Sequence, residues 1–289
     1  MSVQIVIDSA FDLPKRTADE LGLHFVSMRT LFDGVEYLDG VTLTGPEFYQ
    51  KLIESDVLPT TSQVPPADFE EIFEKIVSQG DTALCITVSS RLSGTYQSAN
   101  IAAQAFGDQV IVIDSENVTV GEQLLVLRAV QLQKLGWSAW EMAEILNHEK
   151  KQIRLIALLD TLEYLKKGGR ISASVAFAGA LLSIKPVVAI ENGEIAMLGK
   201  ARGSKNGSNK LMELVKASNG IDFDRPFMLA YSGLNDAILQ KYISDSHELY
   251  EGKTDELPVC CIGSTIGAHA GPGAIGVAFF CRGGRGGRG

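Results

Sequence analysis

The 289-residue sequence has little of what marks several large classes of protein. It has no uninterrupted apolar run near the roughly 18 residues that a membrane span needs. Its first residues have neither the basic segment nor the apolar segment of a secretion signal, so we expect a cytoplasmic protein. Only four cysteines are present, without zinc-ligand spacing or the pattern of a disulfide framework. Three of them lie in or beside apolar runs, which favours reduced thiols in the core.

An excess of positive charge is also missing, because the formal net charge is −9 at pH 7. This acidic balance argues against a general nucleic-acid binder, and we expect no nucleic-acid partner. The final stretch, CRGGRGGRG, is basic, but short Arg-Gly repeats at a chain end are typical of a disordered appendage. We therefore predict a disordered tail over residues 282–289 and leave it out of the fold.

Motifs for cofactors are absent as well. No G-x-G-x-x-G follows the first predicted strand, which argues against a dinucleotide enzyme. The sequence also has no His, Cys and carboxylate cluster with metal-ligand spacing. We expect neither a metal nor a cofactor.

What is present first is an alternation of predicted strands and helices. It predicts a Rossmann-like, mainly parallel α/β domain over residues 1–154. Beyond this boundary, hairpin signals such as Asn192-Gly193 predict an α+β domain over residues 155–281 with a more antiparallel sheet. Within it, the apolar segment 173–183 predicts a buried helix.

Polar residues follow three predicted strands of the first domain, at Asp8-Ser9, Ser89-Ser90 and Asp114-Ser115. Ligands of parallel sheets bind beyond such strand ends, so a shared crevice is expected there. Just after the second of these ends, a helix is predicted to begin near Gly94. The free N–H groups of a helix start favour an anion, which makes Ser93 and Gly94 candidate ligands. The alternative is that Ser93 is an ordinary N-cap.

Two further segments offer polar groups for a ligand. The segment LPTTSQVPP holds Thr61 and Ser62 between prolines, which stiffen it, although it also fits a plain N-cap loop before the helix at 67–79. His269 stands in a Gly/Pro-rich stretch that we interpret as a turn before the last strand. A neutral or charged histidine there could donate a hydrogen bond to a carboxylate or phosphate.

Six motifs together resemble one known family. They are DSAFDLP at 8–14, PTTSQVP at 59–65, SSRLSGTYQSA at 89–99, EYLKKGGRI at 163–171, KPV at 185–187 and IGAHAGPGAIGVAF at 266–279. In this order they are similar to the DegV family of bacterial fatty-acid-binding proteins, which includes the carrier subunit of fatty acid kinase. The resemblance implies a Rossmann-like domain beside a domain whose antiparallel sheet wraps a central helix.

The resemblance also implies a function. A long-chain fatty acid would lie in a tunnel between the domains, with its carboxylate held by the hydroxyls of Thr61 and Ser93. Ser62 and Gly94 are adjacent, and His269 corresponds to the family histidine near the carboxylate. A separate, ATP-dependent fatty acid kinase subunit would phosphorylate the bound acid to an acyl phosphate, so the carrier is not itself the catalyst.

Other interpretations stay open at this point. Arg170 and Arg202 match family positions on a basic face near the ligand mouth, which could dock a partner or touch a membrane transiently, or be merely solvated. An acyl esterase could use Ser93 as nucleophile, His269 as base and Asp114 as orienter, although the turn lacks G-x-S-x-G. A carrier of another amphiphile without a kinase partner is a third possibility.

Overall fold

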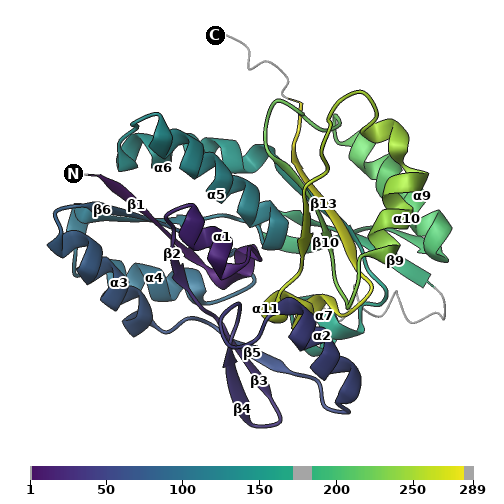
Figure 1. The fold of residues 1–289 in the computed structure, drawn as a ribbon, viewed down its shortest axis with the longest axis horizontal. Coiled ribbons are helices and arrows are strands. Elements are labelled where there is room, and N and C mark those ends of the chain that lie inside the picture. The colour runs from purple at the N-terminus through teal and green to yellow at the C-terminus, as the bar shows by residue number, and fades with distance from the viewer. Residues whose placement is uncertain (1, 172–183, 283–289) are drawn as a thin grey trace.

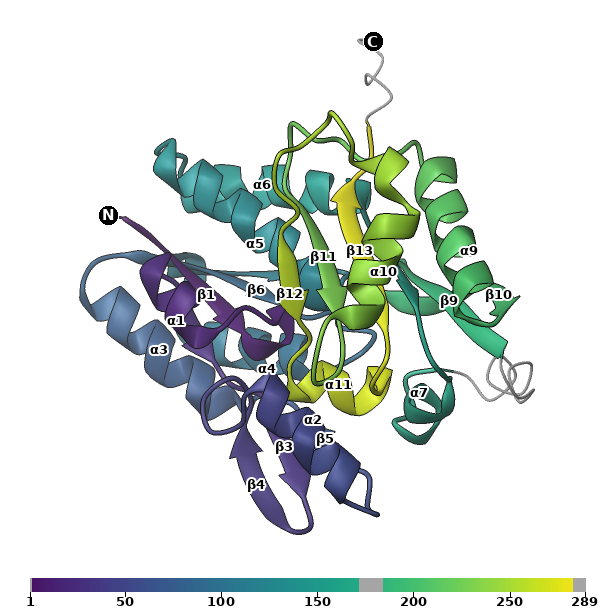
Figure 2. The ribbon, with the colours of Figure 1, turned by 45° about the vertical axis from the view of Figure 1, so that its right-hand side comes forward.

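The computed structural model describes residues 2–171 and 184–282, and its strands form three sheets (Figures 1 and 2). The first sheet has the order β2-β1-β6-β7, and all its neighbouring strands are parallel. Its strands are β1 (Val3–Asp8), β2 (His24–Val26), β6 (Thr82–Thr87) and β7 (Val110–Asp114). The helices of this half are α1 (Lys15–Glu20), α3 (Pro66–Ser78), α4 (Thr95–Ala103), α5 (Thr119–Lys134) and α6 (Ala139–Glu149).

Helices cover both faces of this sheet, with α3 and α4 on one side and α5 and α6 on the other (Figure 1). This is why β6 is apolar along most of its length and buried. The strand order reverses between β1 and β6, because the chain leaves β1 toward β2 and later returns to β6 on the other side. The carboxyl ends of these two strands are where a ligand site is expected in such a sheet.

The second sheet has six strands in the order β10-β9-β8-β13-β11-β12, antiparallel except for the last pair. Its strands are β8 (Ile153–Leu158), β9 (Ile184–Glu191), β10 (Glu194–Arg202), β11 (Phe227–Tyr231), β12 (Val259–Cys261) and β13 (Ile275–Phe280). Helices α9 (Ser204–Ala217) and α10 (Ala237–Asp245) pack on one face. Helix α5 packs on the other, so it lies between the two sheets and joins them through one hydrophobic core.

A smaller sheet, β4-β3-β5, completes the fold beside α2 (Gly45–Glu54), α7 (Glu163–Lys167) and α11 (Ser264–Ala270) (Figure 2). Strands β3 (Arg29–Phe32) and β4 (Val35–Leu38) form a hairpin around Asp33-Gly34, as the sequence predicts. The segment interpreted above as a loop contains β5 (Thr60–Ser62), which pairs with β3 and places Thr61 opposite Thr30.

The parallel first sheet and the mainly antiparallel second sheet confirm the predicted α/β class. The second sheet begins at Ile153, and the division of the chain into domains 1–154 and 155–281 stays a prediction. The buried helix expected at 173–183 lies outside the described residues, as do residues 283–289 of the expected tail. None of the helices within the described ranges is long and apolar enough to cross a membrane.

Candidate functional site

An apolar cavity lies between the segments that follow β2, β6 and β7 and one face of the second sheet. About 910 Å³ of empty space lies within its outline, open solvent at the mouth included. The second sheet supplies one wall, and the start of α5 and the loop after β6 supply much of the other. Apolar residues of the wall include Val88, Leu155, Val188, Ile190, Ile195 and Ile262.

The floor of the cavity is made of small residues that stand side by side on three neighbouring strands. Ala157 of β8 pairs with Gly276 of β13, and Gly276 pairs with Ala230 of β11. Directly paired residues project from the same face of a sheet, and all three line the cavity. A run of larger residues here would fill the space, so this register leaves room for an apolar ligand.

Four of the polar residues that line the cavity are linked by contacts and define what we call the head-group corner: Thr61, Ser93, Arg170 and His269. Thr119 and Thr265 also line the cavity. Thr61 Oγ1 lies 2.8 Å from His269 Nε2, a hydrogen bond that joins β5 to α11. Arg170 donates from Nε to the carbonyl oxygen of Leu92 at 3.0 Å and therefore contacts the turn that carries Ser93. Residues that are far apart in the sequence thus meet at one place.

His269 lies in the last turn of α11, not in the loop that its Gly/Pro-rich surroundings suggest. The helix forms because two buried carboxylates hold its start. Asp39 accepts hydrogen bonds from the Ser264 N–H at 2.9 Å and hydroxyl at 2.7 Å, and Asp12 accepts from the Gly263 N–H at 2.9 Å. At its other end Gly271 has φ of +70°, a conformation that favours glycine and stops the helix.

The environment of His269 favours its neutral form. Burial and, to a smaller extent, the positive charge of Arg170 lower its pKa to about 4. The Nδ1 atom is buried and has no hydrogen-bond partner among the described residues. It lies against Gly168, where a Cβ would stand only 2.1 Å away, so the lack of a side chain there lets the ring reach Thr61.

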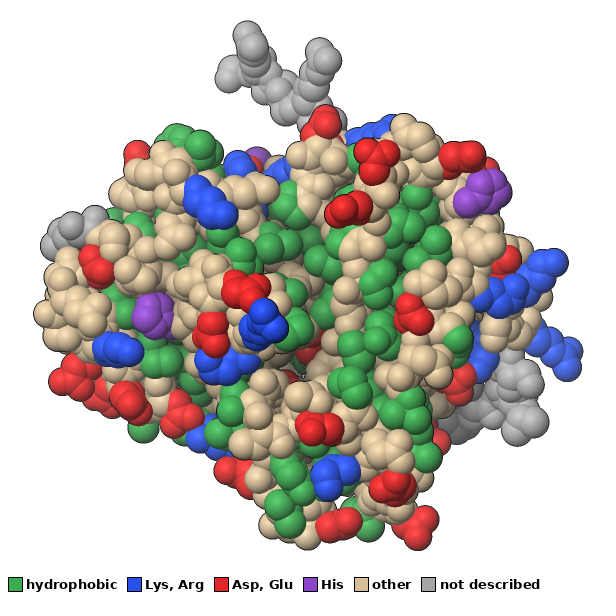
Figure 3. Space-filling model, viewed as in Figure 1, with side chains coloured by type: hydrophobic (Ala, Val, Ile, Leu, Met, Phe, Trp, Pro, Cys, Tyr) green, Lys and Arg blue, Asp and Glu red, His purple; other side chains and the backbone are tan. Residues whose placement is uncertain are grey.

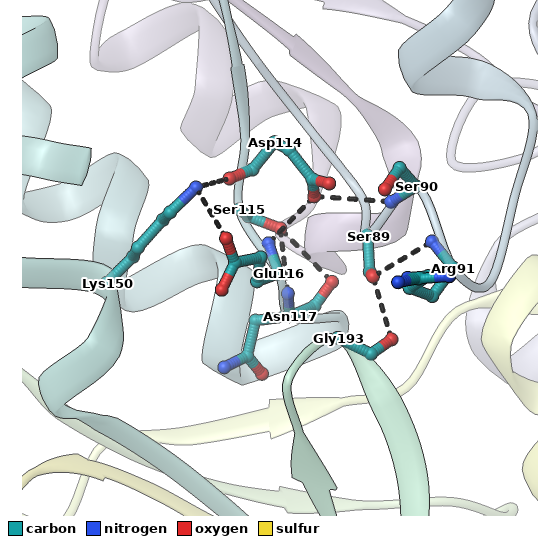
Figure 4. Close-up of polar contacts among 9 residues, drawn as sticks. All are labelled: Ser89, Ser90, Arg91, Asp114, Ser115, Glu116, Asn117, Lys150 and Gly193. Carbon is teal, nitrogen blue, oxygen red and sulfur yellow. Dashed lines mark hydrogen bonds and ion pairs between the residues drawn. The ribbon is translucent and has the colours of Figure 1, made fainter.

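The turn that carries Ser93 is held at both ends. The Ser89 hydroxyl donates to the carbonyl oxygen of Gly193 at 2.7 Å, which docks the β9–β10 hairpin on this turn (Figure 4). The hairpin itself is the one predicted from Asn192-Gly193, and both residues have positive φ. Asp8 accepts from the Val88 N–H at 2.8 Å and so ties the end of β1 to the end of β6.

Burial raises the pKa values of the carboxyl groups beneath this region, which are those of Asp8, Asp12, Asp39 and Glu122. For Asp8, burial outweighs the two backbone hydrogen bonds that it accepts, and its pKa rises to about 7. The sequence marks Asp8 only as a strand-end residue, and Asp12 only as part of a motif. Their buried position follows from the docking of α11 and α5 over the end of the first sheet.

The other predicted site residues do not line the cavity. Ser62 is exposed on β5, and Gly94 is the N-cap residue of α4. Gln63, which the sequence analysis does not single out, bonds from Nε2 to the Ser98 hydroxyl at 2.8 Å and links β5 to α4. Arg202 is exposed at the end of β10 and does not line the cavity, whereas Arg170 does. The basic face that the two arginines were expected to share stays a prediction.

The arrangement expected of a serine hydrolase is not formed. His269 Nε2 bonds to Thr61 rather than to Ser93, and Asp114 is occupied elsewhere. Figure 4 shows Asp114 accepting hydrogen bonds from the backbone N–H groups of Ser90 at 3.2 Å and Glu116 at 2.9 Å. In the described part of the chain, no three His, Cys, Asp or Glu side chains are placed to hold a metal ion.

Comparisons with known proteins agree with one another. The family model described as "Uncharacterised protein, DegV family" matches residues 2–282. A DegV domain-containing protein of Deinococcus radiodurans is 35% identical over 282 residues, which cover 96% of this chain and 98% of the relative.

Solved structures extend the similarity to the fold. One is a DegV family protein from Thermus thermophilus described by its fatty acid binding, with a TM-score of 0.87 and 32% identity over 97% of this chain and all of that one. Another is a stearic-acid-binding protein from Eubacterium ventriosum, with a TM-score of 0.84 and 28% identity over 96% of this chain and 97% of that one. From the family model and these relatives together, the chain belongs to the DegV family.

Proposed function

We propose that this protein binds a long-chain fatty acid in its apolar cavity and presents the carboxylate to a separate, ATP-dependent fatty acid kinase subunit. The observation that carries the proposal is the distribution of polarity: the wall is apolar, and hydroxyl groups are placed at the head-group corner. A fatty acid has the same distribution. The fatty acid binding of the Thermus thermophilus and Eubacterium ventriosum proteins supports this choice of ligand.

The acyl chain supplies most of the affinity in this proposal. Burying about fourteen methylene groups at roughly 0.8 kcal/mol each contributes on the order of 11 kcal/mol, before the cost of ordering the ligand. The carboxylate is expensive to remove from water and needs donors where it comes to rest. Thr61 and Ser93 are those donors, His269 is hydrogen-bonded to Thr61 beside them, and the charge of Arg170 nearby favours an anion.

Presentation of the carboxylate needs a head group that is held without a tight ion pair. A bidentate arginine would occupy both carboxylate oxygens. Arg170 instead donates from Nε and Nη1 to the backbone oxygens of Leu92 and Gly168. Hydroxyl donors at Thr61 and Ser93, both half-buried, leave an oxygen open to a phosphoryl donor.

Contact with the partner is assigned to a basic surface outside the cavity: Lys200, Arg202 and Lys205, all exposed. Figure 3 shows Lys and Arg side chains at the right-hand edge of the molecule, where β9, β10 and α9 lie in Figure 1. Positive charge on an acidic protein suits an acidic kinase surface and a transient contact with an anionic membrane, at which the fatty acid would be exchanged.

Retention of the ligand tests the binding step. Native mass spectrometry of the protein expressed in bacteria should show added mass that matches a C14–C18 fatty acid. Replacing Thr61 and Ser93 together by alanine should strip or weaken this ligand, whereas the exposed Lys205→Ala should keep it. An empty protein that also fails to bind added palmitic acid contradicts the proposal.

Presentation needs a separate test. The loaded protein, ATP and a fatty acid kinase subunit from a related bacterium should together form acyl phosphate, which hydroxylamine traps as a hydroxamate. Arg202→Ala should lower the rate and leave the bound fatty acid in place. Palmitate that stays unphosphorylated with all three components present argues for a carrier without this partner.

A further inference from the structure

Thr95 is the first residue of α4, is fully buried and has no place in the lining of the cavity, yet it contacts a residue that does. Its Oγ1 lies 2.9 Å from Ser93 Oγ, and its backbone N–H donates to the same Ser93 oxygen at 3.2 Å. Its Oγ1 also accepts a hydrogen bond from the Val64 N–H at 3.3 Å. A short chain of hydrogen bonds therefore runs from Val64 through Thr95 to Ser93.

The direction of these bonds follows from the number of protons. A hydroxyl has one proton to donate and two lone pairs that accept. If Ser93 donated to Thr95, the Thr95 oxygen would receive two protons and its own proton would have no acceptor in a buried site. A buried donor without an acceptor is strongly disfavoured. If Thr95 donates to Ser93, every group in the chain is satisfied.

In this second arrangement both lone pairs of Ser93 Oγ are filled, one by the N–H and one by the hydroxyl of Thr95. The only group that Ser93 still offers is its own proton, which is free to enter the cavity. Its oxygen then has no free lone pair for a donor, and His269 is not placed to remove its proton, because His269 is bonded to Thr61.

We propose that Thr95 is a positioning residue that fixes Ser93 as a hydrogen-bond donor to the ligand carboxylate. This inference rests on the proposed fatty acid binding. It identifies Thr95 as the residue that makes Ser93 a donor rather than an acceptor at that site. The head-group corner consequently selects an acceptor, such as an ionised carboxylate, over a donor, such as a protonated fatty amine. The same arrangement leaves the Ser93 oxygen poorly suited to act as a nucleophile.

A double-mutant cycle on palmitic acid binding tests the proposal. Thr95→Val keeps the shape and removes the hydroxyl, and it should weaken binding about tenfold. Thr95→Ser restores the hydroxyl and should bind within about threefold of the unaltered protein. In a Ser93→Ala background, Thr95→Val should have almost no further effect, because the hydroxyl that it directs is gone. Thr95→Ala replaces Thr95→Val in the cycle if the valine variant does not fold.

A merely structural role gives different results. With such a role, Thr95→Val would weaken palmitate binding equally with Ser93 present and in the Ser93→Ala background. Thr95→Ser, although it keeps a hydroxyl, would bind palmitate no better than Thr95→Val. Either outcome overturns the proposal. The ¹³C signal of carboxyl-labelled palmitate adds a second measurement. In Thr95→Val the Ser93 hydroxyl is no longer directed to the carboxylate, so the pKa of the bound palmitic acid should rise. An unchanged pKa also contradicts the proposal. Failure of the unaltered protein to bind palmitate would instead refute the proposed function.

Discussion

The cavity has two regions that are built in different ways. The apolar wall comes largely from neighbouring strands of one sheet, whose side chains are placed by register. The head-group corner comes from β5, the turn after β6, the residues after α7, and α11, four segments that are far apart in the sequence. Strand pairing positions the first region, whereas individual hydrogen bonds and close contacts position the second.

This difference assigns separate tasks to the two regions. Apolar burial has no direction, so the wall determines how much chain fits and how much free energy is gained. Hydrogen bonds need defined distances, so the corner determines which end of the ligand lies where. Changes in the wall should alter chain-length preference, and changes in the corner should weaken all fatty acids alike.

The largest effect is expected from filling the wall with Gly276→Leu. A Cβ at this position makes ordinary contacts, 3.6 Å from Leu155 Cδ1 and 3.8 Å from Ala157 Cβ, so the side chain fits and extends into the cavity. It should displace three to four methylene groups of palmitate, a loss of about 3 kcal/mol or about a hundredfold in Kd. Titration with C10, C12, C16 and C18 acids measures the change.

The matched control is Ala201→Leu on β10, which adds the same bulk at a half-buried residue outside the cavity. Ala201→Leu should leave the chain-length preference for fatty acids unchanged. An equal loss for C10 and C18 acids in the Gly276 variant would show that the wall does not set chain length, and the distinction between the two regions would fail.

A smaller effect is expected in the corner from Gly168→Ala. The new Cβ would lie 2.1 Å from His269 Nδ1, so the ring must move and its hydrogen bond to Thr61 is lost. A hydrogen bond between two neutral groups is worth about 0.5–1.5 kcal/mol, so every fatty acid should bind about two- to tenfold more weakly, with the same order of chain lengths.

Gly199→Ala is the control for this change, since its Cβ would meet only the flexible Lys210 side chain outside the cavity. Its affinity for each acid should match that of the unaltered protein. If Gly168→Ala shifted the preferred chain length instead, the corner would be shaping the chain path as well as the head group.

The smallest effect on ligand binding is expected from the carboxyl groups beneath the corner, whose titration acts on stability instead. The pKa of Asp8 rises from 3.8 unfolded to about 7 folded, so the native protein binds this proton more tightly. Its contribution to stability is full below about pH 4 and is lost as the pH rises through 7. Relative to Asp8→Asn, the unaltered protein should therefore lose stability between pH 5 and pH 8.

Denaturant unfolding across this pH range measures the difference. Asp33→Asn, the same replacement at an exposed turn, is the control and should run parallel to the unaltered protein. A difference between Asp8→Asn and the unaltered protein that stays constant with pH would contradict the raised pKa of Asp8.

Much of the fold could be predicted because its signals are local. Asp33-Gly34 and Asn192-Gly193 need positive φ and alternate with apolar residues, which is enough for a hairpin. The strand that ends at Thr87 and the helix that begins at Thr95 follow from a buried apolar run and a Ser-rich turn. Thr61, Ser93 and His269 were identified by resemblance to the family motifs, and the structure brings them to one cavity.

Other features depend on contacts that no local signal carries. His269 is helical because distant carboxylates hold the start of α11, and Thr61 is in a strand because β3 is beside it. Helix α5 was expected to be amphipathic, but two sheets enclose it and bury most of its residues. Arg170 was assigned to an outer basic face with Arg202, whereas its guanidinium contacts the Ser93 turn.

By itself the sequence determined the helices and strands, the fold class, and the residue types that a carboxylate and an acyl chain require. It could do so because the spacing of apolar residues, the residues in turns and the order of the motifs are properties of the sequence itself. Only the tertiary structure decided that Ala157, Gly276 and Ala230 form one floor and that Thr61 meets His269. Strand register and the docking of α11 bring together atoms from opposite ends of the chain, and the energy of those contacts exists only once the whole core has formed.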